Sequence, residues 1–269
     1  MLEALMAFVF GLVIGSFLNV CVYRLPRDLS VVRPRSFCTA CRHQIAWYDN
    51  LPVLSYMLLA GRCRYCKSRI SMRYPVVELS TGVLFFAYFW RLGPSPMAVK
   101  CCLYGALMVG LLFADLEKRI LPDELTLGGT AAGLLLAWFL PLNEGTVEGL
   151  LWLAGIHWGP RWISLGEAAL GAGFPALLLW LGGRVYLRLR HREGLGLGDV
   201  KLMALVGAFF GLRGALMTLI LGSVAGSVLG YAYIKLTHKD TATYELPFGT
   251  FLGAAAIAVS FAIPVVVAK

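Results

Sequence analysis

Two aspartates stand where an acidic side chain is costly. Asp199 belongs to the segment GLGLGDVK (194–201), which lies between a basic loop at 184–192 and an apolar run at 202–212. Asp115 directly follows the apolar run 97–114. A carboxylate beside a membrane-spanning run costs up to roughly 3 kcal/mol, so it marks a functional site unless local structure explains it. Asp115 and Asp199 are therefore our candidate catalytic residues.

The two aspartates differ in how well a structural role could explain them. Asp199 also fits a flexible Gly-rich loop that ends in a helix N-cap. Asp115 has no such explanation, because a negative charge is disfavoured at the C-terminal end of a helix. The bare backbone of Gly196 and Gly198 would in addition admit an extended substrate strand.

Two carboxylates that meet in a partly desolvated site share one proton and titrate as a pair. The ionised member can activate water while the protonated member protonates a leaving amine, which is aspartyl peptide hydrolysis. The same pair could instead relay protons or cations in a transporter. A third interpretation is a non-enzymatic assembly factor with a zinc-stabilised docking loop. The chemistry of the residues leaves these alternatives open.

Four cysteines form a second constellation. Two CxxC pairs, Cys38 with Cys41 and Cys63 with Cys66, are separated by 21 residues. Four thiolates at this spacing suit a tetrahedral zinc ion, and a site with four protein ligands is closed and structural. The alternative is four unliganded thiols or a redox pair.

The composition indicates a membrane protein. The 269 residues are 59% hydrophobic and 14% charged, with a formal net charge of +9. The basic residues gather in loops between apolar runs, so the charge indicates the positive-inside rule and no nucleic acid partner. We expect an all-α polytopic protein with about eight spans, at 4–22, 75–91, 97–114, 124–141, 166–187, 200–212, 214–236 and 248–268.

The loops define the topology. When the loop at 23–74 is cytoplasmic and the spans alternate in direction, 19 of the 24 Lys and Arg residues lie on the inner side of the membrane. This asymmetry fixes the orientation. We therefore expect a first helix at 1–22, a cytoplasmic zinc-binding domain at 23–74 and a transmembrane core at 75–269, which is the aspartyl protease core in the hydrolytic interpretation. Both aspartates then fall at the cytoplasmic boundary. Pro247 and Gly249 mark irregular backbone at the same boundary, a candidate wall of the active site.

Six segments together carry a resemblance to a known family. They are GSFLNV (15–20), the double CxxC, NLPVLSY (50–56), RYPVVE (73–78), DLEKRILPD (115–123) and GLGLGDVK (194–201). In this order they resemble the bacterial type IV prepilin leader peptidases, a GxGD aspartyl protease family. The resemblance implies removal of the leader from prepilins, or from pseudopilins of type II secretion, at the cytoplasmic face of the inner membrane. It also implies methylation of the new N-terminus with S-adenosylmethionine.

The resemblance assigns roles to individual residues. It implies that Asp115 and Asp199 form the dyad, that the four cysteines hold zinc, and that Gly61 and Arg62 take part in methyl transfer. Arg62 stands where the family often has Lys, and no Gly-rich nucleotide motif for the methyl donor is visible in the sequence. We expect the backbone of the substrate site to include Gly196, Gly198, Lys201, Pro247 and Gly249.

Overall fold

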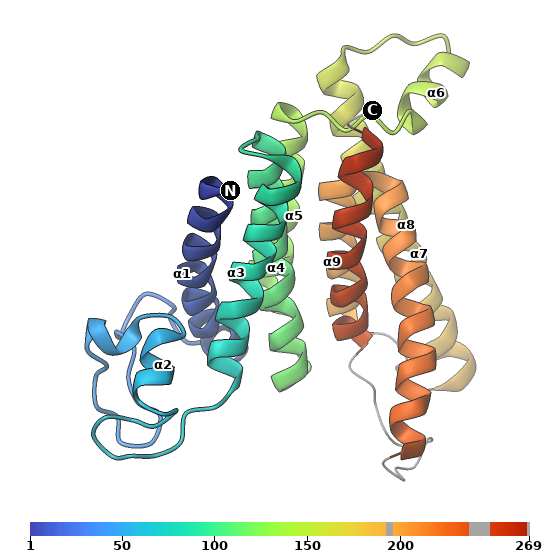
Figure 1. Cartoon of the computed structure of the whole chain (residues 1–269). Helices are drawn as coiled ribbons and strands as arrows, with labels where there is room; N and C mark the ends of the chain where they lie inside the picture. The colour runs from blue at the N-terminus through green and yellow to red at the C-terminus, as the bar shows by residue number, and fades with distance from the viewer. Residues whose placement is uncertain (192–195, 237–247, 268–269) are drawn as a thin grey trace. The chain divides into compact units, whose positions relative to one another are not determined.

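The computed structural model is all-helical, and it describes residues 1–191, 196–236 and 248–267. The chain divides into two compact units, Met1–Ala114 and Asp115–Lys269 (Figure 1). The elements are α1 (Leu2–Arg24), η1 (Leu25–Arg27), η2 (Trp47–Asn50), α2 (Leu54–Leu58), α3 (Arg73–Leu92), α4 (Pro96–Lys118), α5 (Asp123–Phe139), α6 (Thr146–Leu153), α7 (Pro160–Arg190), α8 (Leu197–Leu236) and α9 (Phe248–Val267).

The first unit is built on the packing of α1 against α3. Glycines let the two backbones approach closely: a Cβ on Gly15 would lie 2.6 Å from the Cα of Glu78, and one on Gly11 would lie 2.8 Å from the Cα of Gly82. Small residues at such a crossing are typical of helix pairs in membranes. The side-chain amide of Asn19 donates to the carbonyl oxygen of Tyr74 at 3.0 Å, which adds a polar contact between the same helices.

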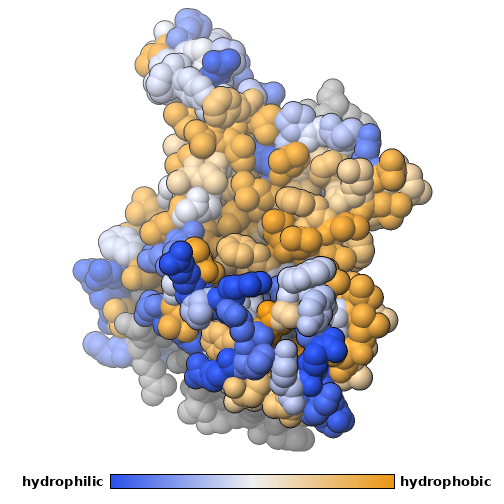
Figure 2. Space-filling view, turned by 90° about the vertical axis from the view of Figure 1, so that its left-hand side faces the viewer, coloured by the Kyte–Doolittle hydropathy of each residue, from blue (hydrophilic) through white to orange (hydrophobic). Residues whose placement is uncertain are grey.

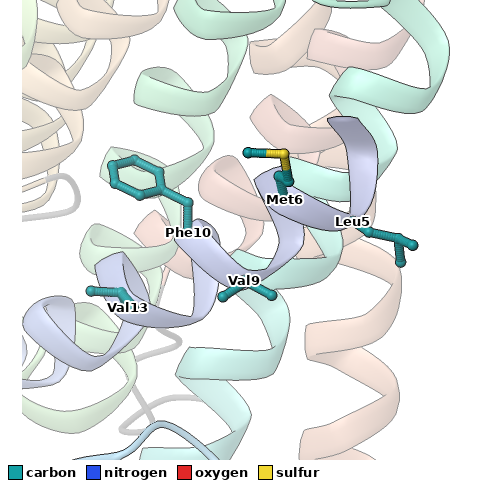
Figure 3. A pocket seen from close by; sticks show the side chains of 5 residues that line it. All are labelled: Leu5, Met6, Val9, Phe10 and Val13. Atoms are coloured by element: carbon teal, nitrogen blue, oxygen red, sulfur yellow. The ribbon is translucent and has the colours of Figure 1, made fainter. Parts of the chain in front are cut away.

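The opposite face of α1 is apolar and uncovered within this unit. Figure 3 shows a shallow hollow on this helix, lined by Leu5, Met6, Val9, Phe10 and Val13. All five side chains are exposed. An exposed apolar helix face of this kind suits contact with lipid chains and offers no polar group that could carry chemistry.

The second unit is organised around α8, which packs against α5, α7 and α9. Glycines again set the close approaches. A Cβ on Gly207 would collide with the backbone carbonyl of Gly171 in α7, and a Cβ on Gly133 in α5 would lie 2.7 Å from the ring of Phe209. Because α8 contacts three other helices, its position determines where Asp199, in its first turn, can lie.

Helix α8 is interrupted at Gly211, where φ is 70° and ψ is −168°. Both carboxylate oxygens of Glu144 accept backbone N–H groups just beyond the break, from Leu212 at 2.9 Å and from Arg213 at 3.1 Å. They therefore cap the second half of α8. A Cβ on Gly211 would collide with that carboxylate. The segment between α5 and α7 thus anchors the break, and it contains the short helix α6, which the sequence did not predict.

Four helical stretches in the described part of the chain are long and apolar enough to cross a membrane: Leu2–Arg27, Pro96–Lys118, Pro160–Arg190 and Leu197–Tyr233. The expectation of a polytopic helical membrane protein is thus confirmed in its coarse form. The predicted spans 75–91 and 124–141 coincide with α3 and α5, which are not among the four. The predicted spans 200–212 and 214–236 form the two parts of α8. Figure 2 shows a broad hydrophobic surface above the mostly hydrophilic residues that connect α1 to α3.

Candidate active site and metal centre

Asp115 lies within α4 and not after it, because this helix continues to Lys118. The side chain is buried, with 6% of the residue exposed. Its carboxylate therefore occupies the last turn of a helix inside the second unit, where neither the helix end nor water stabilises the charge. Such a position needs specific hydrogen-bond donors.

Residue Thr250, near the start of α9, supplies those donors. Its backbone N–H and its hydroxyl both donate to Oδ2 of Asp115, each at 2.7 Å. Both bonds join residues 135 positions apart in the chain. The sequence analysis did not identify Thr250. The available signal was a hydroxyl residue directly after Gly249, but nothing in the sequence indicates which carboxylate it would reach.

Asp199 meets Asp115 at Gly249. A Cβ on this glycine would lie 3.1 Å from Oδ1 of Asp199 and 3.2 Å from Oδ2 of Asp115. The two carboxylates therefore flank the same small volume, so their charges lie close together. Gly249 is buried, and its missing side chain leaves room between the two carboxylates.

Two contacts hold the start of α8 against the segment that follows α4. A Cβ on Gly198 would lie 3.2 Å from the side chain of Leu121, so this glycine allows close packing. The ammonium group of Lys201 pairs with Oδ1 of Asp123, the first residue of α5, at 2.6 Å. These contacts bring the first turn of α8 next to the last turn of α4, and thus Asp199 next to Asp115.

The other predicted backbone positions have different surroundings. Gly196 is exposed, and a Cβ there would lie 3.8 Å from Oδ2 of Asp199. Gly198 faces Leu121, and Lys201 is engaged with Asp123. Pro247 lies outside the described residues. The role of all five positions in substrate binding stays a prediction.

The four cysteines converge in the first unit. Their sulfur atoms all lie within 4.8 Å of one another, and the Sγ atoms of Cys38 and Cys66 are 3.8 Å apart. A tetrahedral ion with metal–sulfur bonds of about 2.3 Å requires sulfur atoms about 3.8 Å apart. The arrangement therefore fits a metal ion bound by four thiolates.

Two similar turns present these sulfur atoms. In each turn the residue four positions after the first cysteine has a left-handed φ, 61° at Arg42 and 58° at Lys67. The N–H of Cys38 donates to the carbonyl oxygen of His43, and the N–H of Cys63 donates to that of Ser68, both at 2.9 Å. The two CxxC segments thus form the same local turn.

The electrostatics of the turns favour the thiolate form of Cys38 and Cys66, whereas at Cys41 the N–H of His43 is outweighed by burial and the neighbouring thiols, which raise the pKa to about 11. Burial opposes ionisation of the Cys38 thiol, but the N–H groups of Cys41 and Ala40 and the hydroxyl of Ser68 outweigh it, and they lower the pKa of Cys38 to about 6. A hydroxyl and a backbone N–H, both from Ser68, also lower the pKa of Cys66. Metals bind the thiolate form, so these donors prepare the cluster for an ion.

Gly61 and Arg62 immediately precede the second turn. Gly61 is buried with a φ of 65°, and a Cβ there would lie 2.8 Å from the hydroxyl of Tyr56. This conformation explains the glycine structurally. Arg62 is exposed and forms an isolated antiparallel bridge with Arg69. Their part in methyl transfer stays a prediction.

The helical membrane protein thus combines a carboxylate pair, the buried Asp115 and the half-buried Asp199, with a tetracysteine cluster. Residues 9–92 match the profile described as "Bacterial Peptidase A24 N-terminal domain", and residues 101–231 match the "Type IV leader peptidase family". The chain belongs to this family of aspartic peptidases. No solved structure matches it.

Three relatives agree with this assignment, and each carries the name "Prepilin leader peptidase/N-methyltransferase". The protein from Myxococcus xanthus is 40% identical over 88% of this chain, which spans 65% of that relative's length. The Pseudomonas putida protein is 35% identical, over 93% of this chain and 87% of its own. The Pseudomonas aeruginosa protein is 33% identical, over 91% and 85%. These matches give no support to the transporter interpretation.

Proposed function

We propose that this protein is a membrane aspartic peptidase that removes the leader from prepilins or pseudopilins and then methylates the new N-terminal residue. The relatives' shared name supports both activities. The observation that carries the peptidase activity is the convergence of Asp115 and Asp199 on Gly249, across 83 residues of intervening sequence.

The geometry supports activation of a water molecule between the two carboxylates. The ionised carboxylate takes a proton from a water molecule, and the water oxygen attacks the carbonyl carbon of the scissile peptide. The protonated carboxyl group stabilises the developing oxyanion. The tetrahedral intermediate then collapses: the C–N bond breaks, the leaving nitrogen takes a proton from the pair, and a carboxylic acid and an amine are released.

We assign the ionised role to Asp115. Its Oδ2 accepts two hydrogen bonds from Thr250, and hydrogen bonds to a carboxylate favour its charged form. Asp199 then holds the shared proton and acts as the acid. Thr250 is a positioning residue in this proposal, since it fixes Oδ2 of Asp115 and leaves the other oxygen for water.

The tetracysteine cluster would hold zinc through Cys38, Cys41, Cys63 and Cys66. A zinc ion with four thiolates has no open position, so it would cross-link the two turns and take no part in hydrolysis. The segment at 23–74 would then be a zinc-stabilised domain beside the first helix at 1–22, with the protease core at 75–269. The donor set and the sulfur separations support this role.

Methyl transfer would use S-adenosylmethionine as donor. A Cβ on Gly61 would meet the Tyr56 hydroxyl, and the side chain of the next residue, Arg62, is exposed. These residues do not by themselves compose a recognisable site for the donor, so the part of Gly61 and Arg62 rests on the family resemblance. Replacement of Arg62 by Ala tests it, because this exposed side chain is not required for the fold of the turn.

The substrate's location follows from the proposed topology. We infer eight membrane segments in a bacterial inner membrane, with the tetracysteine domain and both aspartates at the cytoplasmic face. A prepilin presents a charged leader to the cytosol and an apolar helix to the bilayer. Its scissile bond would therefore lie at the depth of the two carboxylates.

Intact-mass analysis of a purified prepilin tests the whole proposal. The prepilin is incubated with the wild-type protein and with D199N, each with and without S-adenosylmethionine. We expect the wild type to remove the leader in both conditions and to add one methyl group only with the donor. D199N should do neither, because methylation needs the new N-terminus.

The matched control is E124Q, which changes an exposed acid in the first turn of α5. It should cleave the prepilin like the wild type. Intact prepilin after incubation with folded, metal-loaded wild type would overturn the peptidase proposal. Cleavage without any methyl gain would overturn only the methyltransferase part.

A further inference from the structure

The residues between α1 and α3 expose an apolar surface that neither the metal cluster nor the carboxylate pair uses. It consists of Trp47, Leu51, Leu54, Met57 and Leu58, which we call the α2 face. Three of these, Leu54, Met57 and Leu58, are spaced i, i+3 and i+4 and so share one side of the helix. Met57 is 71% and Leu58 76% exposed, more than Val9 on the outer face of α1 at 59%.

The α2 face is part of a folded element and is not a loose loop. The hydroxyl of the buried Ser55 donates to the carbonyl oxygen of Tyr48 at 2.9 Å and accepts the N–H of Leu51 at 3.0 Å. These bonds join η2 to α2. Trp47 packs edge-on against Tyr48, with ring centroids 5.7 Å apart. The apolar side chains are therefore held outward by a structured core.

One hydrogen bond ties the start of α2 to α3. The N–H of Val53, directly before α2, donates to Oε2 of Glu78 at 2.7 Å. Glu78 is buried in the second turn of α3, inside the segment predicted to span the membrane. Val53 has a φ of 60°, which a β-branched residue adopts only where its surroundings hold it. In Figure 1, α2 lies beside the lower ends of α1 and α3.

The segment that carries the α2 face is basic. Residues 25–72 contain eight Lys and Arg but only two Asp. Asp49 forms a bidentate pair with Arg64, with N–O distances of 2.6 and 2.7 Å, so these two residues add no net charge and the excess of basic residues remains. Basic side chains beside exposed Trp, Leu and Met are typical of segments that lie in a membrane interface with anionic lipids.

We propose that the α2 face is inserted into the leaflet adjoining the tetracysteine domain, with the surrounding arginines on anionic phospholipid headgroups. The tie from Val53 to Glu78 places the face at the boundary of the bilayer that α1 crosses. Trp47 would lie at headgroup level, where its amphipathic ring is favoured. The lipid surface would thereby fix the domain relative to α1 and α3. This proposal does not depend on the peptidase activity.

Fluorescence of the full-length protein in lipid nanodiscs tests the proposal. The probe is the emission contributed by Trp47, taken as the difference between the wild type and W47F. The nanodiscs contain phosphatidylglycerol and a phospholipid brominated either near the headgroup or near the end of the acyl chain. We expect loss of the Trp47 emission with the shallow bromine, a smaller loss with the deep bromine, and less loss when phosphatidylcholine replaces phosphatidylglycerol.

A pair of variants separates the α2 face from the rest of the domain. M57D should reduce the quenching of Trp47 by bromine, because a carboxylate on the face disfavours insertion. V32D, which changes an apolar side chain of similar exposure (77%) outside the α2 face, should leave the quenching unchanged. Retained zinc in both variants shows that the domain remains folded.

Two results would overturn the proposal. Trp47 emission that bromine leaves intact but acrylamide quenches would show that the face is in water. Emission that neither reagent quenches would show that another part of the chain covers the face.

Discussion

The cysteine cluster and the aspartate pair are two sites built on opposite principles. In the cluster, each half comes from four consecutive residues whose turn places both sulfur atoms, and the halves join within a segment of 29 residues. In the pair, Asp115, Asp199 and Thr250 come from three different helices. A site of local turns can be recognised from spacing, whereas a site of distant helices depends on the packing of an entire unit.

The largest expected effect tests the chemistry of the pair. D115N and D199N each remove an ionisable carboxyl group while keeping its shape, so each should lower prepilin cleavage by about 10³-fold or more. The measurement is the rate of leader loss at saturating substrate. A variant that retained cleavage within about tenfold of the wild type would remove that aspartate from the proposed dyad.

The second prediction tests whether the two sites are independent. C63S removes a buried ligand of the proposed zinc ion, so we expect loss of bound zinc and a less protected segment at 23–74. Elemental analysis and hydrogen exchange measure these two effects. Hydrogen exchange of α8 and α9 should stay unchanged, since the pair belongs to the second unit. Equal loss of protection in both units would contradict the comparison.

The third prediction concerns the contact that orients Asp115. T250V removes the hydroxyl donor but keeps the backbone N–H, so about half of the hydrogen bonding to Oδ2 remains. One hydrogen bond to a charged group is worth about 1.5–3 kcal/mol, which corresponds to a loss of roughly 10- to 100-fold in kcat.

The conservative variant T250S keeps the hydroxyl and should restore most of this activity. The pH profile of cleavage should also change in T250V, because the proton shared by the two aspartates becomes less biased towards Asp199. A purely structural role would lower the amount of folded protein and leave the pH profile of the remaining enzyme unchanged.

The smallest expected effect concerns the break in α8. E144A removes the cap on Leu212 and Arg213, and the cost of losing such a cap is about 1 kcal/mol of stability. Thermal unfolding of the detergent-solubilised protein measures it. E148A, in the first turn of α6, is the matched control and should unfold at the wild-type temperature. A larger loss of cleavage than of stability would show that the break also positions Asp199.

The sequence by itself determined the local features of this protein. The CxxC spacing predicted the cluster because each turn needs only its own residues, and the convergence of four sulfur atoms followed. The apolar runs predicted most helices to within a few residues, since burial in a membrane acts on each segment separately. Because a carboxylate at a membrane boundary is energetically costly, the sequence also singled out Asp115 and Asp199 as a candidate catalytic pair.

Only the tertiary structure decided how distant segments meet. The sequence placed Asp115 after its helix, whereas α4 continues past it to Lys118. The carboxylate is stabilised there by Thr250, on a helix that begins more than 130 residues later, and no local pattern encodes such a contact. The break at Gly211 likewise depends on the hydrogen bonds that Glu144 accepts. The position of α8 depends on the glycines that let it approach α5 and α7 closely. Long-range packing fixes these partners because each is chosen by the shape of the whole unit and not by its neighbours in the chain.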